Sequence, residues 1–544
     1  MIFEQRILRG SAVARAVAGL VLAGSSAVAQ DNRVVLENTP TRMRGFETAQ
    51  TYHAGTLELS VGTSQTSPGS GPGTGLQTYY GGGSYALSDR FMFGLEFQDF
   101  NDPAAGPING STPLIEMSTL ALWGKMSLYQ GERLSVAGLA SIESVLNLRS
   151  PIWNGSVPHF LIGAIKAPIS YQVNDSFALH LTPGVTFMPD SVNGRQFYGD
   201  TIGSVGVGAS WKAGRRLSFG ASVEAPISGT NTIASDGSYK KVPVWTVSGR
   251  YNVTPKTALE GYVTNGYGMT PATSILTFWP VGDEVLAGLR LIYTPGAARP
   301  DSYRGVAAPV TPAQKSLQLD GFTLGGADTL EPGTLRFSGW YGSDNNAGVL
   351  LGFSPDRDGE IQLIFEQYSD NPTASAGLVP TTDVRFMIGP KLRFMDQNNG
   401  NAFSLAGRAL YGRRITGFGQ KTGVFFAEAM ASYQAPNGRA VFTANPKIAA
   451  FGNTEIAGVG LGVNIRATDT LDLIAEVTPV ALDGSTPTWA AGLRYQLGDS
   501  GLSVDAQATN AIGRFGIGSM VAQDDLRVSV MLSKTFGVTG LKFY

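Results

Sequence analysis

The chain has 544 residues, of which 70 are glycine, none is cysteine and only 15% are charged. Glycine therefore makes up about 13% against about 7% in average proteins, while charge falls far below the usual share. The formal net charge of −2 argues against a nucleic-acid partner, and the lack of cysteine excludes disulfides and thiolate metal sites.

Residues 1–29 have the three parts of a secretory signal peptide. Three arginines precede the apolar residues 16–23, and an Ala-x-Ala cleavage pattern follows at residues 27–29. The apolar stretch is shorter than the about 20 residues that a membrane-spanning helix needs. We therefore expect export, cleavage near Ala29, and a mature protein without a helical anchor.

From about residue 50 onward, apolar and polar residues alternate with a period of two, which indicates β-strands. Leu335 and Phe337 share one face of such a segment, for example, while Arg336 lies on the other. Many of these segments run for about 9–12 residues, the length of a tilted strand that crosses a bilayer. The alternation thus favours membrane-spanning strands over the shorter strands of a soluble sandwich.

The connections between the predicted strands alternate in length. Residues 56–293 contain about twelve strands, joined by long segments such as 64–76 and short turns such as 88–90. Short turns on one side of the membrane and long loops on the other are typical of outer-membrane barrels. Aromatic residues end alternate strands, as expected at a membrane interface: Tyr85, Tyr129, Tyr171, Trp211, Tyr251 and Tyr293.

In these features, residues 50–544 resemble the outer-membrane β-barrel proteins of Gram-negative bacteria. The resemblance implies an all-β fold, a transmembrane antiparallel β-barrel in the cell outer membrane that contacts outer-membrane lipid. It also implies insertion by the barrel assembly machinery, which often reads a final aromatic strand. Here Phe543 and Tyr544 follow Lys542 and Gly540, so the last strand is predicted at 526–536 instead.

The sequence of the barrel region is duplicated. Residues 244–251 match 488–495, and 55–59 match 333–337, in the same order along both halves. We therefore predict a first β-barrel repeat over 30–293, a Pro-rich linker over 294–318 and a second repeat over 319–544. Two barrels of about twelve strands and one barrel of about twenty-four both fit, and the linker with its repeated lead-in favours two.

Assigning the apolar strand faces to lipid leaves a set of charged residues for the lumen. Such charges can filter ions and solutes, or they can pair across a narrow barrel and plug it. Small or apolar inward residues such as Ala137 and Leu139 argue against a wide, water-filled pore. The candidate lumen charges are Glu58, Glu96, Glu116, Glu143, Glu224, Glu260, Arg250 and Arg290 in the first half, and Arg336, Arg385, Lys391, Arg393, Arg408 and Arg494 in the second.

No catalytic, cofactor-binding or metal-binding motif is expected. The chain has three histidines, His180 is predicted to face the lumen, and a lipid-modifying enzyme would need a serine–histidine pair facing lipid. We therefore predict a protein that is not an enzyme and acts as a passive, porin-like channel for small solutes or ions. The alternative is a non-conducting structural barrel, or one associated with export, for instance of exopolysaccharide.

Overall fold

The structure is a computed structural model that describes residues 40–65, 77–199, 201–294, 317, 319–369, 384–414, 423–451, 454–481 and 486–537. The predicted signal peptide over 1–29 and nearly all of the predicted linker over 294–318 lie outside these residues. The chain divides into two compact units with their boundary near residue 300. Within the described part of the chain, no helix has the length and apolar character to cross a membrane.

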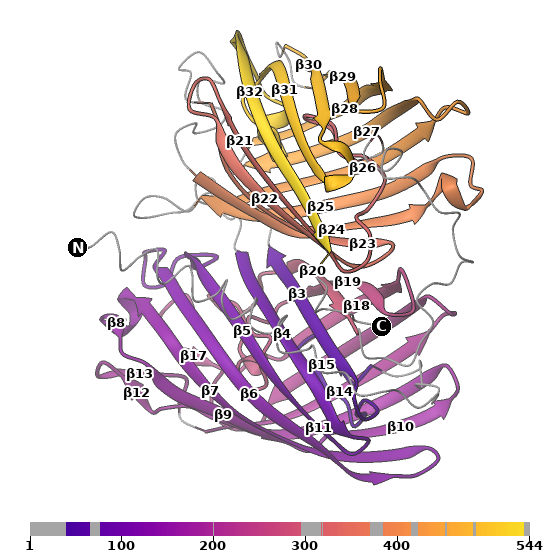
Figure 1. Cartoon of the computed structure of the whole chain (residues 1–544). Helices are drawn as coiled ribbons and strands as arrows, with labels where there is room; N and C mark the ends of the chain where they lie inside the picture. The colour runs from indigo at the N-terminus through magenta and orange to yellow at the C-terminus, as the bar shows by residue number, and fades with distance from the viewer. Residues whose placement is uncertain are drawn as a thin grey trace. The chain divides into compact units, whose positions relative to one another are not determined.

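The first unit is a closed antiparallel β-barrel (Figure 1). Its sheet closes where β20 pairs with β3, with Arg290 opposite Gly62. Strands β9 and β10 both lie between β7 and β11 and together form one interrupted strand, so the described wall has twelve strands. The wall strands are β3 (Leu57–Gln65), β4 (Gln77–Ser88), β5 (Phe91–Pro103), β6 (Leu114–Gln130), β7 (Leu134–Ser150), β9 (Phe160–Lys166), β10 (Ile169–Asn174), β11 (Phe177–Phe187), β14 (Thr201–Lys212), β15 (Leu217–Pro226), β18 (Val244–Asn252), β19 (Thr257–Thr264) and β20 (Leu286–Tyr293).

Short elements outside the wall belong to the residues before β3 and to the long connections. The segment before β3 forms a small hairpin, and the long connections carry three further short strand segments or pairs and two 3₁₀ turns. These elements are β1 (Arg42–Met43), β2 (Phe46–Glu47), β8 (Gly155–Val157), β12 (Ser191–Val192), β13 (Arg195–Gln196), β16 (Thr232–Ile233), β17 (Tyr239–Lys240), η1 (Pro151–Trp153) and η2 (Thr273–Ile275).

The second unit is also a closed barrel, and β21 pairs with β32 to close it. Two closed barrels exclude the alternative of a single barrel of about twenty-four strands. The predicted last strand over 526–536 lies within β32. The strands are β21 (Thr334–Gly342), β22 (Ala347–Asp356), β23 (Gly359–Gln367), β24 (Val384–Met395), β25 (Ser404–Arg414), β26 (Gly423–Gln434), β27 (Ala440–Phe451), β28 (Thr454–Arg466), β29 (Leu471–Thr478), β30 (Thr488–Gln496), β31 (Leu502–Ala511) and β32 (Ala522–Gly537), with 3₁₀ turns η3 (Gln397–Asn399), η4 (Gly498–Ser500) and η5 (Gly516–Ser519).

Segments whose sequences match occupy equivalent strands of the two barrels. Residues 244–251 lie in β18 and residues 488–495 in β30, each the tenth wall strand of its barrel. Residues 57–59 begin β3 and residues 334–337 begin β21, each the first wall strand. The order of the sequence matches is therefore also the order of the strands around each wall.

The alternation of residues separates an apolar outside from a filled inside. On β32, Leu526, Val528, Val530 and Leu532 are 50–59% exposed, whereas Arg527 between them is completely buried. Large apolar side chains are exposed in the same way on other strands of both barrels. This surface is the reverse of a soluble protein's, whose apolar residues gather inside.

The core of the first barrel lies inside the wall, toward the end that carries the long connections. Phe100 packs edge-on against Tyr267 with ring centroids 5.8 Å apart, and Tyr267 lies 4.8 Å from Trp279. Ile115 and Met117 of β6 belong to the same buried cluster. In the second barrel the corresponding cluster includes Tyr368 and Phe515.

Candidate functional site: the occupied barrel interiors

The residues that precede the first wall strand lie inside the first barrel. This first lead-in, residues 40–50, contacts seven strands around the wall, including β19, where Arg44 donates to Thr264 (3.3 Å). Lys125 on β6 donates to the carbonyl of Thr41 (2.7 Å) and forms an ion pair with Glu47 (2.9 Å). Arg42 pairs with Glu47 (2.7 Å) and with Glu96 on β5. Contacts to β10, β11, β14 and β15 complete the ring, so the lead-in is enclosed by the wall.

The connection between the last two strands also folds into the first barrel. In this first lumen loop, residues 265–285, the backbone N–H of Ala272 donates to Glu143 on β7 (2.6 Å). The hydroxyl of Thr270 donates to the same carboxylate (2.5 Å). The ammonium of Lys166 on β9 donates to Ser274 in the loop (2.9 Å) and to Glu224 on β15 (3.1 Å). Wall charges thus hold this loop in the lumen.

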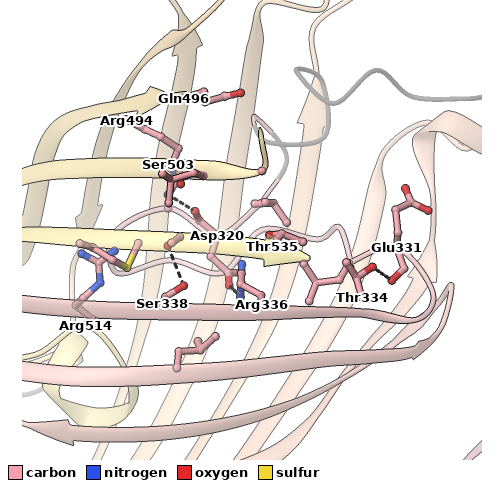
Figure 2. Close-up of a pocket in the computed structure, with 18 of the residues that line it drawn as sticks. Asp320, Glu331, Thr334, Arg336, Ser338, Arg494, Gln496, Ser503, Arg514 and Thr535 are labelled. Atoms are coloured by element: carbon pink, nitrogen blue, oxygen red, sulfur yellow. Dashed lines mark hydrogen bonds and ion pairs between the residues drawn. The ribbon is translucent and has the colours of Figure 1, made fainter. Parts of the chain in front are cut away.

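The second barrel is occupied by the equivalent segment before its first strand. In this second lead-in, residues 319–330, Asp320 accepts a hydrogen bond from Arg336 on β21 (2.7 Å) (Figure 2). It accepts another from Lys391 on β24 (3.0 Å). Glu476 on β29 accepts the backbone N–H groups of Phe322 (2.8 Å) and Thr323 (2.6 Å). On the opposite side, Gly325 donates to Glu428 on β26 (3.0 Å), so this lead-in too is surrounded.

A second lumen loop, residues 512–521, completes the filling of the second barrel. Its backbone N–H groups at Arg514 and Phe515 donate to Glu366 on β23 at 2.6 and 3.2 Å. Lys447 on β27 donates to the carbonyl of Thr323 (2.7 Å) and to Ser519 (3.4 Å), so one wall lysine contacts both inserted segments. Each barrel therefore holds a lead-in and a lumen loop.

Glycines on the eighth wall strand make room for the lead-in in both barrels. A Cβ at Gly206 on β14 would lie 2.6 Å from the ring of Phe46, and one at Gly208 would lie 3.0 Å from Met43. On β28, a Cβ at Gly460 would overlap Leu324, and one at Gly462 would lie 3.0 Å from it. These inward glycines are close-approach positions, where an added side chain would press on the lead-in.

Most of the candidate lumen charges lie at the interior and are paired. Glu116 is an exception. Its neighbours Ile115 and Met117 on β6 are completely buried, and Glu116 lies on the opposite face of the strand beside Asn147. Arg290 donates to Glu260 (2.7 Å), with Arg250 3.8 Å from the same carboxylate. The other contacts are Glu58 with Tyr52, Glu96 with Arg42, Glu143 with Thr270, Glu224 with Lys166, Arg336 and Lys391 with Asp320, Arg385 with the ring of Tyr368, Arg393 with Asp358, Arg408 with Glu428 and Arg494 with Asp505.

Sequence reasoning missed the charged residues of the inserted segments. Arg42, Glu47, Asp320, Asp328 and Arg514 all lie in the lead-ins or the second lumen loop, which have no strand periodicity. The sequence did contain a signal that the lead-ins belong to the barrels. The lead-in is part of the repeated sequence and carries charged residues among small and apolar ones. The side of the wall against which such a segment packs is not encoded in its local pattern.

The interior contains a histidine between two serines. The Nδ1 atom of His180 lies 2.8 Å from the hydroxyl of Ser170, and Nε2 lies 3.0 Å from that of Ser210. The Ser170 hydroxyl also accepts the backbone N–H of Ala49 in the lead-in (2.9 Å). His180 therefore faces the lumen, as predicted from its parity, and its neighbours link it to the lead-in. Across the described ranges, no cluster of three or more histidine, aspartate or glutamate side chains could hold a metal ion.

A closed antiparallel wall with an apolar outside and charged residues inside defines the class of transmembrane β-barrel proteins. No protein-family model and no curated protein matches the chain.

Among solved structures, the chain is similar to the KdgM porin, with 10% identity and a TM-score of 0.28 over 43% of this chain and 98% of that one. It is also similar to the NanC porin, with 8% identity and a TM-score of 0.29 over 44% and 98% of the two chains. A mutant of the ferric enterobactin receptor of Pseudomonas aeruginosa aligns over 89% of this chain and 81% of its own, at 9% identity and a TM-score of 0.22. At such TM-scores these likenesses carry no argument about function.

We expect valine at Gly206 or at Gly460 to displace the lead-in of the corresponding barrel. Each added side chain meets a packed apolar residue, and overpacking of this kind costs about 1–3 kcal/mol. Denaturant unfolding measures the loss, and hydrogen exchange of residues 40–50 or 319–330 reports the displacement.

Gly261→Val is the matched control, because a Cβ there would lie an ordinary 3.7 Å from Leu289. Unchanged exchange of the lead-in in Gly206→Val and Gly460→Val would contradict the close-approach role of these glycines.

The pairing of Asp320 predicts that the second lead-in resists mild acid. Burial alone would raise the pKa of Asp320, but Lys391 and Arg336 hold it well below its usual range. Because the folded-state pKa is depressed, the stabilisation is complete above the unfolded pKa of about 3.9 and is lost only as the pH falls toward the folded value. Hydrogen exchange of residues 319–330, corrected for intrinsic rates, should therefore stay slow from neutral pH to about pH 4. Release of the segment already at about pH 6 would contradict this assignment.

Proposed function

We propose that the protein is a Gram-negative outer-membrane double barrel whose interiors are closed to solutes in this conformation. Porin-like passage of small solutes or ions through a barrel would require displacement of its lead-in. The observation that carries the proposal is the occupation of each interior by two chain segments that buried wall charges hold in place.

The outer surface supports insertion into a membrane. A closed barrel pairs the backbone groups of every wall strand, which is what a strand needs in lipid. The wall exposes large apolar side chains, and Tyr129, Tyr171 and Trp211 are 44–55% exposed near the short turns. Aromatic side chains of this kind are typical of the boundary between lipid and water.

The filled interior supports a closed state. An open porin has a continuous polar lumen that holds water. Here Glu47, Lys125 and Lys391 are almost completely buried, and each has an oppositely charged partner within about 3 Å across the contact between lead-in and wall. Withdrawal of a lead-in separates such pairs and leaves the wall charges buried without partners. Breaking a buried ion pair in this way costs several kcal/mol. The closed conformation is therefore the ground state that we expect for both barrels.

A second candidate is a non-conducting barrel with a structural or export-associated role. It is favoured by the presence of the same two kinds of insert in both barrels, since a channel used for passive diffusion gains nothing from such filling. The two candidates differ in one measurable property, which is whether removal of an insert opens a conducting path.

We expect the full-length protein to be silent in planar bilayers and a lead-in variant to conduct. In this variant, residues 320–328 are replaced by a glycine–serine segment of the same length, which removes the partners of Arg336, Lys391 and Glu476. A glycine–serine replacement of the short turn at 435–439 is the control and should stay silent. A conducting full-length protein would contradict the closed state, and a folded but silent lead-in variant would support the non-conducting candidate.

We expect an arginine at Val207 to destabilise the first barrel in lipid. Val207 lies near the middle of β14 and is 53% exposed, so a charge there would face the bilayer core. Such substitutions cost about 2–4 kcal/mol near the midplane of transmembrane barrels. Urea unfolding in lipid vesicles measures this loss. Gly214→Arg, in the open space of a short turn, should have little effect, and equal effects of the two variants would rule out a lipid-facing Val207.

A further inference from the structure

A cavity of about 210 Å³ lies inside the second barrel beside its lead-in. Residues of the lead-in form one side, and the other sides come from β21, β30, β31, β32 and the second lumen loop. Three arginines, Arg336, Arg494 and Arg514, line it from three different elements (Figure 2). We propose that this cavity binds a small organic carboxylate.

The side chain of Arg514 carries the proposal, because it is a buried cation with free donors. Arg514 is 2% exposed, and among the described residues nothing accepts hydrogen bonds from its Nε and Nη1 atoms. Its remaining nitrogen, Nη2, lies 4.0 Å from Asp505. A buried donor without an acceptor is costly, and a buried charge without a close partner is more so. An anion in the cavity would satisfy both requirements.

Asp505 and Asp320, two carboxylates at or near the cavity, are already engaged by other cations. Asp505 accepts two hydrogen bonds from Arg494, at 2.8 and 2.9 Å. Asp320 accepts from Arg336 at 2.7 Å and from Lys391 at 3.0 Å. These two acids therefore leave the Nε and Nη1 donors of Arg514 available to a ligand.

Aromatic rings hold Arg514 in place without using its donors. The guanidinium carbon lies 5.8 Å from the ring centroid of Phe322 and 5.9 Å from that of Trp340, within the range of cation–π contacts. Such contacts engage the face of the guanidinium, so the N–H groups along its edge remain directed elsewhere. Arg336, which also lines the cavity, has a buried Nε without an acceptor among the described residues.

The shape and lining of the cavity define the ligand class. The planar fork of a guanidinium matches the two oxygens of a carboxylate. Pockets for drug-sized molecules have volumes of about 300–1,000 Å³, and this cavity is smaller, so the ligand has only a few heavy atoms. Leu319, Leu350 and Met531 add apolar surface, which suits a short hydrocarbon chain and disfavours inorganic phosphate.

The test is equilibrium binding to the full-length protein in detergent, measured by titration calorimetry with sodium butyrate. Inorganic phosphate and butylammonium chloride serve as comparison probes for charge and shape. We expect saturable binding of butyrate at one site, with weaker binding of phosphate and no binding of butylammonium. No saturable binding of butyrate, or tighter binding of phosphate, would overturn the proposal.

Variants locate the site. Arg514→Gln removes the free donors and should weaken butyrate binding by about tenfold or more, as expected for a charge-assisted contact. Arg514→Lys keeps the charge without the fork, so it should also bind butyrate more weakly than the native chain does. Arg466→Gln removes a buried arginine of the same barrel that pairs with Asp472 (2.8 Å) outside this cavity, and it should bind butyrate normally.

Circular dichroism establishes whether each variant is folded. If Arg514→Gln does not fold, the butyrate affinity of Arg514→Lys tests the proposal instead. Native affinity in a folded Arg514 variant, or an equal loss in Arg466→Gln, would overturn the assignment. Binding in detergent does not depend on conduction in bilayers, so this proposal and the proposed function can fail separately.

Discussion

The pairing of wall charges with the inserted segments is the interaction on which both interiors depend. A closed twelve-stranded wall satisfies its own backbone, but it turns polar side chains toward a narrow space that lipid does not reach. Glu143, Glu366, Glu428 and Glu476 on the walls meet this constraint by accepting backbone N–H groups of the inserts. The inserts gain acceptors for backbone N–H groups that no wall strand pairs with, and the walls gain partners for their buried charges.

Some of the wall glycines follow from the same constraint. A lead-in that crosses the lumen needs wall positions without side chains, and Gly206, Gly208, Gly460 and Gly462 supply them on the eighth strand of each barrel. The eighth strands of the two barrels thus share both the paired glycines and the contact with the lead-in. Glycine is costly inside a strand, so its recurrence at the point of contact indicates that the contact is part of the fold.

Much of the wall could be predicted from the sequence, and little of the interior could. Strand alternation is a local signal, and so is the rhythm of long and short connections. Arg42 and Glu96, by contrast, are 54 residues apart and meet only because the lead-in folds back into the lumen. Glu116 shows where strand alternation alone fails to predict which face is inside. The rule that apolar residues face lipid does not hold for Ile115 and Met117, because they pack inward against an aromatic cluster at that end of the first barrel.

The difference in charge between the two walls has a structural cause. The first wall places Glu96 beside an arginine of its lead-in, whereas the second places Arg336, Lys391 and Arg393 beside Asp320 and Asp328. At equivalent positions on the first wall strand, the charge is negative in the first barrel (Glu58) and positive in the second (Arg336). Each wall is therefore matched to its own lead-in, and an acidic or basic wall is no measure of the solute that a barrel would select. After this matching, Arg514 still has two buried donors without an acceptor among the described residues, so ligand recognition in the second barrel should depend on Arg514.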